Sequence, residues 1–254
     1  MAASHPQPIP AGRANDGQRP APRLDTQDWS RVDAELGRDG VAVLPALLSR
    51  TECTGLAALY DGADPDTFRS RVVMARHGFG QGEYKYFDYP LPDLVSELRT
   101  GLYGRLAATA NRWNAMLGLE ASFPPSHAEY LLRCHAAGQA RATPLLLRYG
   151  TGDYNCLHQD LYGAIVFPLQ VVVLLSAPGL EFDGGELVLT EQRPRMQSRP
   201  LVVPLQQGDA AVFAVSHRPV QGSRGFHRVT MRHGVSRIRR GTRSTLGLIF
   251  HDAA

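Results

Sequence analysis

From Pro144 onward, short apolar runs alternate with turn residues, and this pattern constrains the fold more than any other feature of the sequence. Steps such as Asp183-Gly184-Gly185 and Gly208-Asp209 separate the runs and favour turns between strands. Eight short strands after a helical first half predict an α+β fold: a jelly roll, or double-stranded β-helix, with N-terminal helices packed outside. The expected strands cover residues 145–149, 156–161, 166–176, 186–190, 201–205, 210–215, 228–238 and 245–251.

The first half of the chain carries helix signals. Asp28 can cap a helix that Gly40 ends, ahead of a short strand at 41–44. Ser49 and Glu52 form a capping-box pattern. We therefore expect helices from 29 to before Gly40, from 49 to about 60, from 93 to 117 and from 127 to 136. Between the second and third of these helices, residues 68–89 are strand-like and rich in aromatic side chains.

The length of 254 residues and the hydrophobic share of 43% are enough for one sizeable core. Residues 1–23 hold prolines and glycines with few apolar side chains, and we expect them to be a disordered tail. Residues 24–254 are expected to form a single domain, whose jelly-roll core covers about 143–251.

Several classes of protein are excluded by what the sequence lacks. No apolar run approaches 18 residues, so neither a transmembrane helix nor a membrane partner is expected. The N-terminus has no apolar block of the kind that a secretory signal needs. Cys53, Cys134 and Cys156 are too scattered for a disulfide framework or a cysteine-rich zinc site. We expect a cytoplasmic protein, and no feature indicates an obligate protein partner.

The positive charge is unevenly distributed. Only Lys85 among the 27 basic residues is a lysine, a bias that a GC-rich genome explains. The stretch from Arg193 to Arg243 holds eleven arginines and one acidic residue, Asp209, for a formal charge of +10, whereas the whole chain carries +3. Such a local field favours an anionic ligand or partner.

His158 and Asp160 lie two residues apart on an expected strand, so both side chains project from the same face. An imidazole and a carboxylate so placed can hold two corners of a metal, and a second histidine would complete the facial triad of a non-heme Fe(II) oxygenase. The His-x-Asp pattern is weak by itself. The downstream candidates for the third ligand are His217, His227, His233 and His251.

His233 has the best context of these four histidines. Its strand is expected to turn near Arg240-Gly241 and to lead into a last strand that carries Arg243. An arginine fork can hold a carboxylate through two parallel hydrogen bonds. Thr245, on the same face as Arg243, can add a hydroxyl.

The combination of His158-x-Asp160, His233, Arg243 and Thr245 resembles the 2-oxoglutarate/Fe(II)-dependent dioxygenases over about residues 143–251. Residues 192–199 and 232–236 are similar to a group of bacterial oxygenases proposed to act on damaged, alkylated DNA. The Arg148-Tyr149-x-x-Gly152 run before His158 is similar to the nucleobase-dealkylase branch of these enzymes. Two positions depart from that branch, which usually has a polar residue at Leu147 and an arginine at Ile249.

The resemblance implies a mechanism. His158, Asp160 and His233 would bind Fe(II), and Arg243 would hold the 5-carboxylate of 2-oxoglutarate with help from Tyr149 and Thr245. Together with O2, the cosubstrate would be converted to succinate while a C–H bond of the substrate is hydroxylated. If that carbon is an N-methyl group, formaldehyde is released.

The substrate class rests on weaker signals. The aromatic segment 79–89, with Tyr84 and Tyr86, can form a lid that stacks on a planar base, or it can be ordinary packing. Arg193, Arg195 and Arg199 can contact phosphates, or they can be a solvated loop. Glu186 can pair with an arginine of the site.

Three functions remain open at this stage. The favoured one is oxidation of damaged bases in DNA, with 2-oxoglutarate and single-stranded or damaged DNA as partners. The first alternative is hydroxylation of a protein side chain, of the prolyl type, or of a small metabolite. The second is a non-enzymatic jelly roll that senses a 2-oxo acid or a metal.

Overall fold

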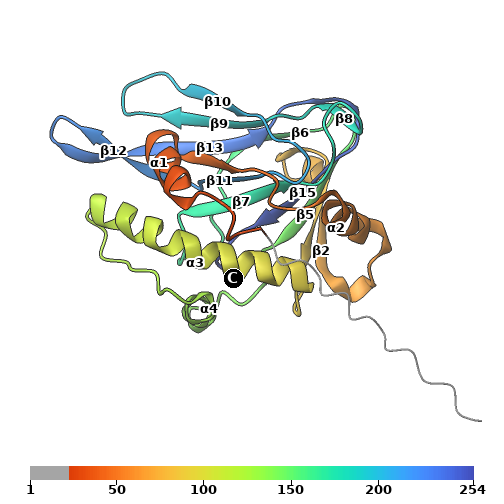
Figure 1. The fold of residues 1–254 in the computed structure, drawn as a ribbon, viewed down its shortest axis with the longest axis horizontal. Coiled ribbons are helices and arrows are strands. Elements are labelled where there is room, and N and C mark those ends of the chain that lie inside the picture. The colour runs from red at the N-terminus through yellow and green to blue at the C-terminus, as the bar shows by residue number, and fades with distance from the viewer. Residues whose placement is uncertain (1–22) are drawn as a thin grey trace, which may run out of the picture.

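The chain forms two antiparallel β-sheets with the helices outside them (Figure 1). This arrangement comes from a computed structural model, which describes residues 23–254. The expected disorder of residues 1–23 lies outside the described residues, with the exception of Arg23. The α+β jelly roll that the strand pattern predicts is confirmed.

The larger or major sheet has seven strands, and the smaller or minor sheet has six. The major sheet runs β1 (Val41–Leu44), β11 (Ala210–Ala214), β7 (Leu169–Leu174), β15 (Arg243–Leu248), β5 (Leu145–Tyr149), β4 (Glu83–Phe87) and β2 (Phe68–Val73). The minor sheet runs β10 (Arg199–Val203), β9 (Leu187–Gln192), β13 (Gly225–Val235), β6 (Tyr154–His158) and β3 (Gly80–Gln81), while β12 (His217–Gly222) pairs with β13. A separate ribbon joins β8 (Phe182–Gly184) to β14 (Ile238–Gly241).

The first two helices begin where their capping residues predict, and the first ends at its predicted glycine. The Asp28 side chain accepts a hydrogen bond from the Arg31 amide, and Gly40 ends the first helix with φ of 73°. Ser49 and Glu52 form both hydrogen bonds of the capping box. The α-helices are α1 (Trp29–Asp39), α2 (Arg50–Gly62), α3 (Asp93–Met116) and α4 (His127–Ala136), with short 3₁₀ turns at η1 (Pro65–Thr67) and η2 (Met74–Arg76).

Helix α3 runs along the outside of the major sheet, and α4 lies beyond it (Figure 1). Leu98, Leu102 and Leu106 of α3 are buried in the main hydrophobic core. Arg99, also buried, donates hydrogen bonds to the carbonyls of residues 249–251 and pairs with the Asp252 carboxylate at 2.8 Å. The helix therefore holds the C-terminal segment that follows β15. Among residues 23–254, no helix combines the length and the apolar character needed to cross a membrane.

The structure differs from the strand prediction in three places. The strand with His158 ends at that residue, so Asp160 lies in the loop that follows and not on the same strand. The run expected over 228–238 is divided between β13 and β14. Strands β8 and β12 were not expected, because β8 is very short and β12 is polar and contains Pro219. Proline is tolerated in β12 because this strand lies at an edge of its sheet.

Candidate metal centre

His158 and His233 are direct neighbours across two antiparallel strands. Strand β6 pairs with β13 in a register that sets His158 opposite His233, and the centroids of the two imidazoles are 4.2 Å apart. Side chains opposite one another on adjacent strands approach closely. His227 is instead opposite Val220 in the β12–β13 hairpin, so it does not reach this site.

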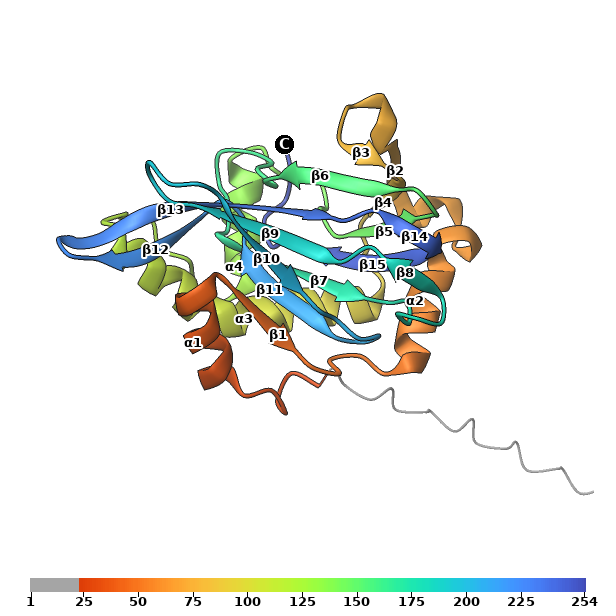
Figure 2. The same cartoon turned by 90° about the horizontal axis from the view of Figure 1, so that it is seen from above.

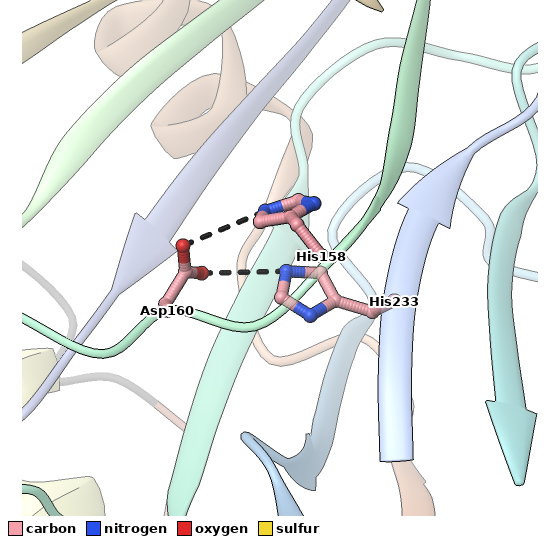
Figure 3. Close-up of side chains that lie close together, drawn as sticks. All are labelled: His158, Asp160 and His233. Atoms are coloured by element: carbon pink, nitrogen blue, oxygen red, sulfur yellow. Dashed lines mark ion pairs between the residues drawn. The ribbon is translucent and has the colours of Figure 1, made fainter. Parts of the chain in front are cut away.

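Asp160 completes the group from the loop after β6 (Figure 3). Its Oδ1 lies 3.5 Å from Nε2 of His158, and its Oδ2 lies 3.3 Å from Nε2 of His233. One donor atom from each of the three residues lies within 4.8 Å of the others. The expectation that Asp160 shares a strand with His158 is wrong, because the chain leaves the sheet after His158; the three side chains nevertheless converge.

Neighbouring hydrogen bonds orient the three side chains. Nδ1 of His158 donates to the Cys156 carbonyl at 2.8 Å, which leaves Nε2 to face the carboxylate. The Tyr162 hydroxyl donates to Asp160 Oδ1 at 2.7 Å, and the Gln170 amide donates to Oδ2 at 2.9 Å. Partners of this kind typically fix metal ligands in place. Sequence reasoning missed both Tyr162 and Gln170. Gln170 could not be found from the sequence, because only the register of β7 places it beside Asp160.

The electrostatics of Asp160 and His233 favour the donor forms that a metal requires, whereas the contact with Asp160 favours a protonated His158 in the absence of a metal. Burial would raise the pKa of the Asp160 carboxyl, but the hydrogen bonds from His158 and His233 outweigh it and hold the pKa well below the usual value. Burial lowers the pKa of His233, which favours the neutral imidazole. Burial would also lower the pKa of His158, but hydrogen bonding to Asp160 raises it overall.

The donor set fits a divalent transition metal. Two imidazoles and one carboxylate, converging from one side, match the facial triad that leaves three coordination positions open in non-heme Fe(II) oxygenases. The carboxylate is ionised and His233 is neutral, as metal binding needs.

A cavity of about 320 Å³ extends from the three ligand candidates between the two sheets, and Tyr149, Arg243 and Thr245 line it. Arg243 lies opposite Tyr149 across β15 and β5, and Thr245 follows two residues later on the same face. The structure thus brings together all six residues that the sequence assigned to metal and cosubstrate.

Arg243 is buried, with 1% of its surface exposed. Its Nε and Nη1 atoms have no hydrogen-bond partner within residues 23–254. Burial lowers the pKa of its guanidinium to about 10, so the group remains charged near neutral pH. A buried charge without partners is costly, and an anion that accepts those hydrogen bonds would remove the cost.

The residues expected to meet a substrate divide into two groups. Tyr84 lines the cavity. Tyr86 is buried against Tyr162, with ring centroids 6.3 Å apart, and is not among the lining residues. Arg193, Arg195 and Arg199 lie outside the cavity, around the connection between β9 and β10.

Part of the positive charge of this β9–β10 connection is already paired. Nε of Arg193 lies 2.9 Å from Oε1 of Glu191, and Arg199 reaches Oε2 of the same carboxylate at 3.4 Å. Glu191 is buried and also pairs with Arg218. Arg193 and Arg199 are therefore partly occupied, whereas no ion pair within the described part of the chain involves Arg195.

Residues 82–253 match the model of a family described as an oxygenase that catalyses oxidative methylation of damaged DNA. The chain belongs to this oxygenase family. Two proteins of Mycobacterium tuberculosis, the uncharacterized MT2286 (strain CDC 1551 / Oshkosh) and Rv2227 (strain H37Rv), are each 52% identical to the oxygenase over 168 residues, which cover 66% of this chain and 72% of theirs.

Solved structures show the same fold at low sequence identity. A prolyl-4-hydroxylase of Pseudomonas putida has a TM-score of 0.54 and 15% identity, covering 89% of the oxygenase and 100% of that chain. A prolyl 4-hydroxylase of Phytophthora capsici has a TM-score of 0.53 and 17% identity, covering 91% of the oxygenase and 65% of that chain. The oxygenase thus has the jelly roll of the prolyl hydroxylases.

Proposed function

We propose that the protein is a 2-oxoglutarate- and Fe(II)-dependent dioxygenase that oxidises damaged or methylated bases in nucleic acid. The observation that carries the cofactor assignment is the conjunction, in one cavity, of the His158–Asp160–His233 cluster with the buried, unpartnered guanidinium of Arg243. The overall reaction takes a substrate C–H bond, O2 and 2-oxoglutarate to the alcohol, succinate and CO2. At an N-methyl carbon, the resulting hemiaminal releases formaldehyde and the demethylated base.

Each residue has a separate task in this proposal. His158, Asp160 and His233 would hold Fe(II), which supplies the activation of O2 when it is bound. Arg243 binds the distal carboxylate of the cosubstrate through its planar fork, and the hydroxyls of Tyr149 and Thr245 can add hydrogen bonds. Burial raises the pKa of the Tyr149 hydroxyl to about 12, so it remains a donor at neutral pH.

Apolar side chains line much of the cavity beside the cluster. The Phe213 ring packs 4.8 Å from the imidazole of His233, measured between centroids. Leu147, Leu187 and Val171 also line the cavity. An apolar lining limits the access of water to Arg243, which strengthens the contact between its guanidinium and a carboxylate.

A nucleic-acid substrate is supported by charge and by the family description. The stretch from Arg193 to Arg243 carries +10, and phosphate contacts would use its exposed members. Arg228 and Arg232 are exposed on β13, the strand that carries His233, and no ion pair in residues 23–254 engages them. Arg195, Arg224 and Arg237 are likewise exposed and outside the ion pairs of the described residues, so they are equally available to phosphates, whereas Arg193 and Arg199 contribute less because of Glu191.

The test is a substrate panel. Protein with Fe(II) and 2-oxoglutarate is incubated with methylated single-stranded oligonucleotides, with peptides and with small metabolites, and succinate and formaldehyde are measured. We expect stimulation by methylated oligonucleotides, and loss of all turnover in His233→Ala. Stimulation by peptides or metabolites alone would instead indicate a side-chain or metabolite hydroxylase, and no turnover with any compound would indicate a sensor.

A further inference from the structure

A glycine-containing strap, residues 74–82, connects the two sheets beside the cavity; its strand β3 pairs with β6 (Figure 2). The Cys156 amide donates to the Phe79 carbonyl at 2.9 Å, and the Met74 amide donates to the Gly82 carbonyl at 3.0 Å. A Cβ atom on Gly80 would lie 2.4 Å from the Tyr154 carbonyl oxygen. The backbone of the strap is therefore held tightly against the minor sheet.

The other end of the strap lies against the cosubstrate residues. A Cβ atom on Gly82, where φ is 117°, would lie 2.8 Å from Cδ1 of the Tyr149 ring. The strap is thus anchored on β6, which carries a metal-ligand candidate, and on β5, which carries Tyr149. Any side chain on the strap that lines the cavity has a defined position relative to both.

The strap presents two stacked aromatic rings to solvent. His77 and Phe79 have ring centroids 5.3 Å apart and an interplanar angle of 22°. Both side chains are exposed, and Phe79 is 48% exposed although it also lines the cavity. An exposed ring pair at a cavity gains little from burial in the free protein, but the uncovered part of the Phe79 ring can stack on a planar ligand.

We propose that Phe79, backed by His77, stacks on the nucleobase that enters the cavity for oxidation. This inference rests on the proposed function and names the residue that positions its substrate. Stacking suits a base because every nucleobase has a π face, and it needs no charged partner. Of the aromatic segment 79–89, Phe79 and Tyr84 line the cavity and Tyr86 does not; Phe79 is the more exposed of the two lining residues.

The experiment compares two single-stranded oligonucleotides that differ only at one position, a methylated base or an abasic site. Binding is measured without O2, in the presence of Fe(II) and 2-oxoglutarate. We expect the wild type to prefer the methylated oligonucleotide by roughly five- to a hundredfold, the range that stacking of one base on an aromatic ring typically yields. Phe79→Leu, which keeps an apolar side chain but removes the ring, should reduce this ratio towards one. Phe79→Tyr should retain it.

Phe226 provides the matched control. It is a phenylalanine of similar exposure, 43%, in the β12–β13 hairpin, and it does not line the cavity. Phe226→Leu should keep both the binding ratio and 2-oxoglutarate turnover. His77→Ala leaves Phe79 in place without its stacking neighbour and should lower the binding ratio by less than Phe79→Leu does. If Phe79→Leu fails to fold, His77→Ala tests the stacking role in its place.

The outcomes separate the two proposals. If the wild type prefers the methylated oligonucleotide but Phe79→Leu and His77→Ala both keep the full ratio, the stacking role is overturned and the nucleic-acid function stands. If the wild type binds methylated and abasic oligonucleotides equally, stacking on the base is likewise overturned. If it binds neither, both the stacking role and the nucleic-acid function are overturned.

Discussion

At the scale of single residues, the free-energy cost of burying the Arg243 guanidinium depends on whether a ligand accepts its hydrogen bonds. Its guanidinium is buried, charged near neutral pH and without hydrogen-bond partners at Nε and Nη1 within the described chain. A carboxylate that accepts hydrogen bonds from it gains a charge-assisted contact in a dry environment. The residue therefore provides the most direct test of the cosubstrate.

Arg243→Ala should weaken the binding of 2-oxoglutarate by about ten- to a hundredfold, because a charge-assisted hydrogen bond contributes about 1.5–3 kcal/mol. Binding of Fe(II) should change much less, since the ligand set is intact. Arg243→Lys should rescue partially, because it keeps the charge but loses the fork. Titration of 2-oxoglutarate in a succinate assay measures the effect. Unchanged dependence on 2-oxoglutarate in Arg243→Ala would refute the assignment.

The pH dependence of 2-oxoglutarate affinity follows from the same residue. Burial lowers the pKa of the Arg243 guanidinium to about 10, so the group is charged below that pH and neutral above it. Its contribution to affinity should be constant from about pH 7 to 9 and should fall only as the pH rises through about 10. Calorimetric titrations at several pH values would check this. A steep fall between pH 7 and 8 that Arg243→Lys abolishes would contradict it.

The hydrogen bonds to Asp160 lead to a prediction about metal affinity. Tyr162→Phe and Gln170→Ala each remove one donor to its carboxylate. Each variant should bind Fe(II) about ten- to a hundredfold more weakly, the usual effect of losing a partner that orients a ligand. Gln221→Ala, an exposed site on β12, is the control. Equal metal affinity in all three variants would mean that these contacts do not orient Asp160.

At the scale of elements, α3 and the C-terminal segment depend on one another. Arg99 of α3 is 1% exposed, and its partner Asp252 is fully buried. The Asp252 carboxylate also accepts hydrogen bonds from Tyr89 and His135, so the loop after β4, helices α3 and α4 and the C-terminal segment meet in one network. This network holds the segment after β15, the strand that carries Arg243 and Thr245.

Removing Arg99 should destabilise the whole fold. Arg99→Ala leaves the Asp252 carboxylate buried without its cation, and breaking a buried pair in this way costs about 3–5 kcal/mol. Arg105→Ala on the same helix removes an exposed pair with Asp25 and should cost at most about 1 kcal/mol. Urea unfolding gives both free energies. A cost near 1 kcal/mol for Arg99→Ala would show that the network contributes little.

At the scale of the whole molecule, exposed arginines of the basic stretch lie on the minor sheet. The basic stretch from Arg193 to Arg243 includes the exposed Arg228 and Arg232 on the minor sheet, whereas α3 covers the outside of the major sheet (Figure 1). Nucleic acid that approaches the cavity would therefore meet its phosphate contacts on the minor-sheet side.

Binding of single-stranded DNA should weaken steeply with salt, with a log–log slope of about −2 to −4. The double change Arg228→Ala and Arg232→Ala should flatten the slope by about 1.4, since each phosphate contact on a single strand contributes about 0.7. Changing Arg193, Arg195 and Arg199 to Ala should also flatten it, but by less per residue because Glu191 pairs two of them. Arg112→Ala on α3 is the control.

Prediction from the sequence succeeded where the signal is local. Asp28, Gly40 and the Ser49–Glu52 box mark helix ends because capping involves residues three positions apart. The turns after Pro144 divided the β half well enough to predict the jelly roll. The prediction failed for β12, because its polar, proline-containing sequence becomes a strand only by pairing with β13.

The sequence by itself determined most of the elements, the fold class and the residue types available for a metal and a carboxylate. Only the tertiary structure decided that His158 is opposite His233 and that Gln170 and Tyr162 orient Asp160. It also decided that Glu191 forms ion pairs with Arg193 and Arg199. The physical reason is the range of the interactions. Caps and turns depend on neighbours in the chain, whereas strand register and buried charge pairing depend on segments that meet only when the two sheets have assembled.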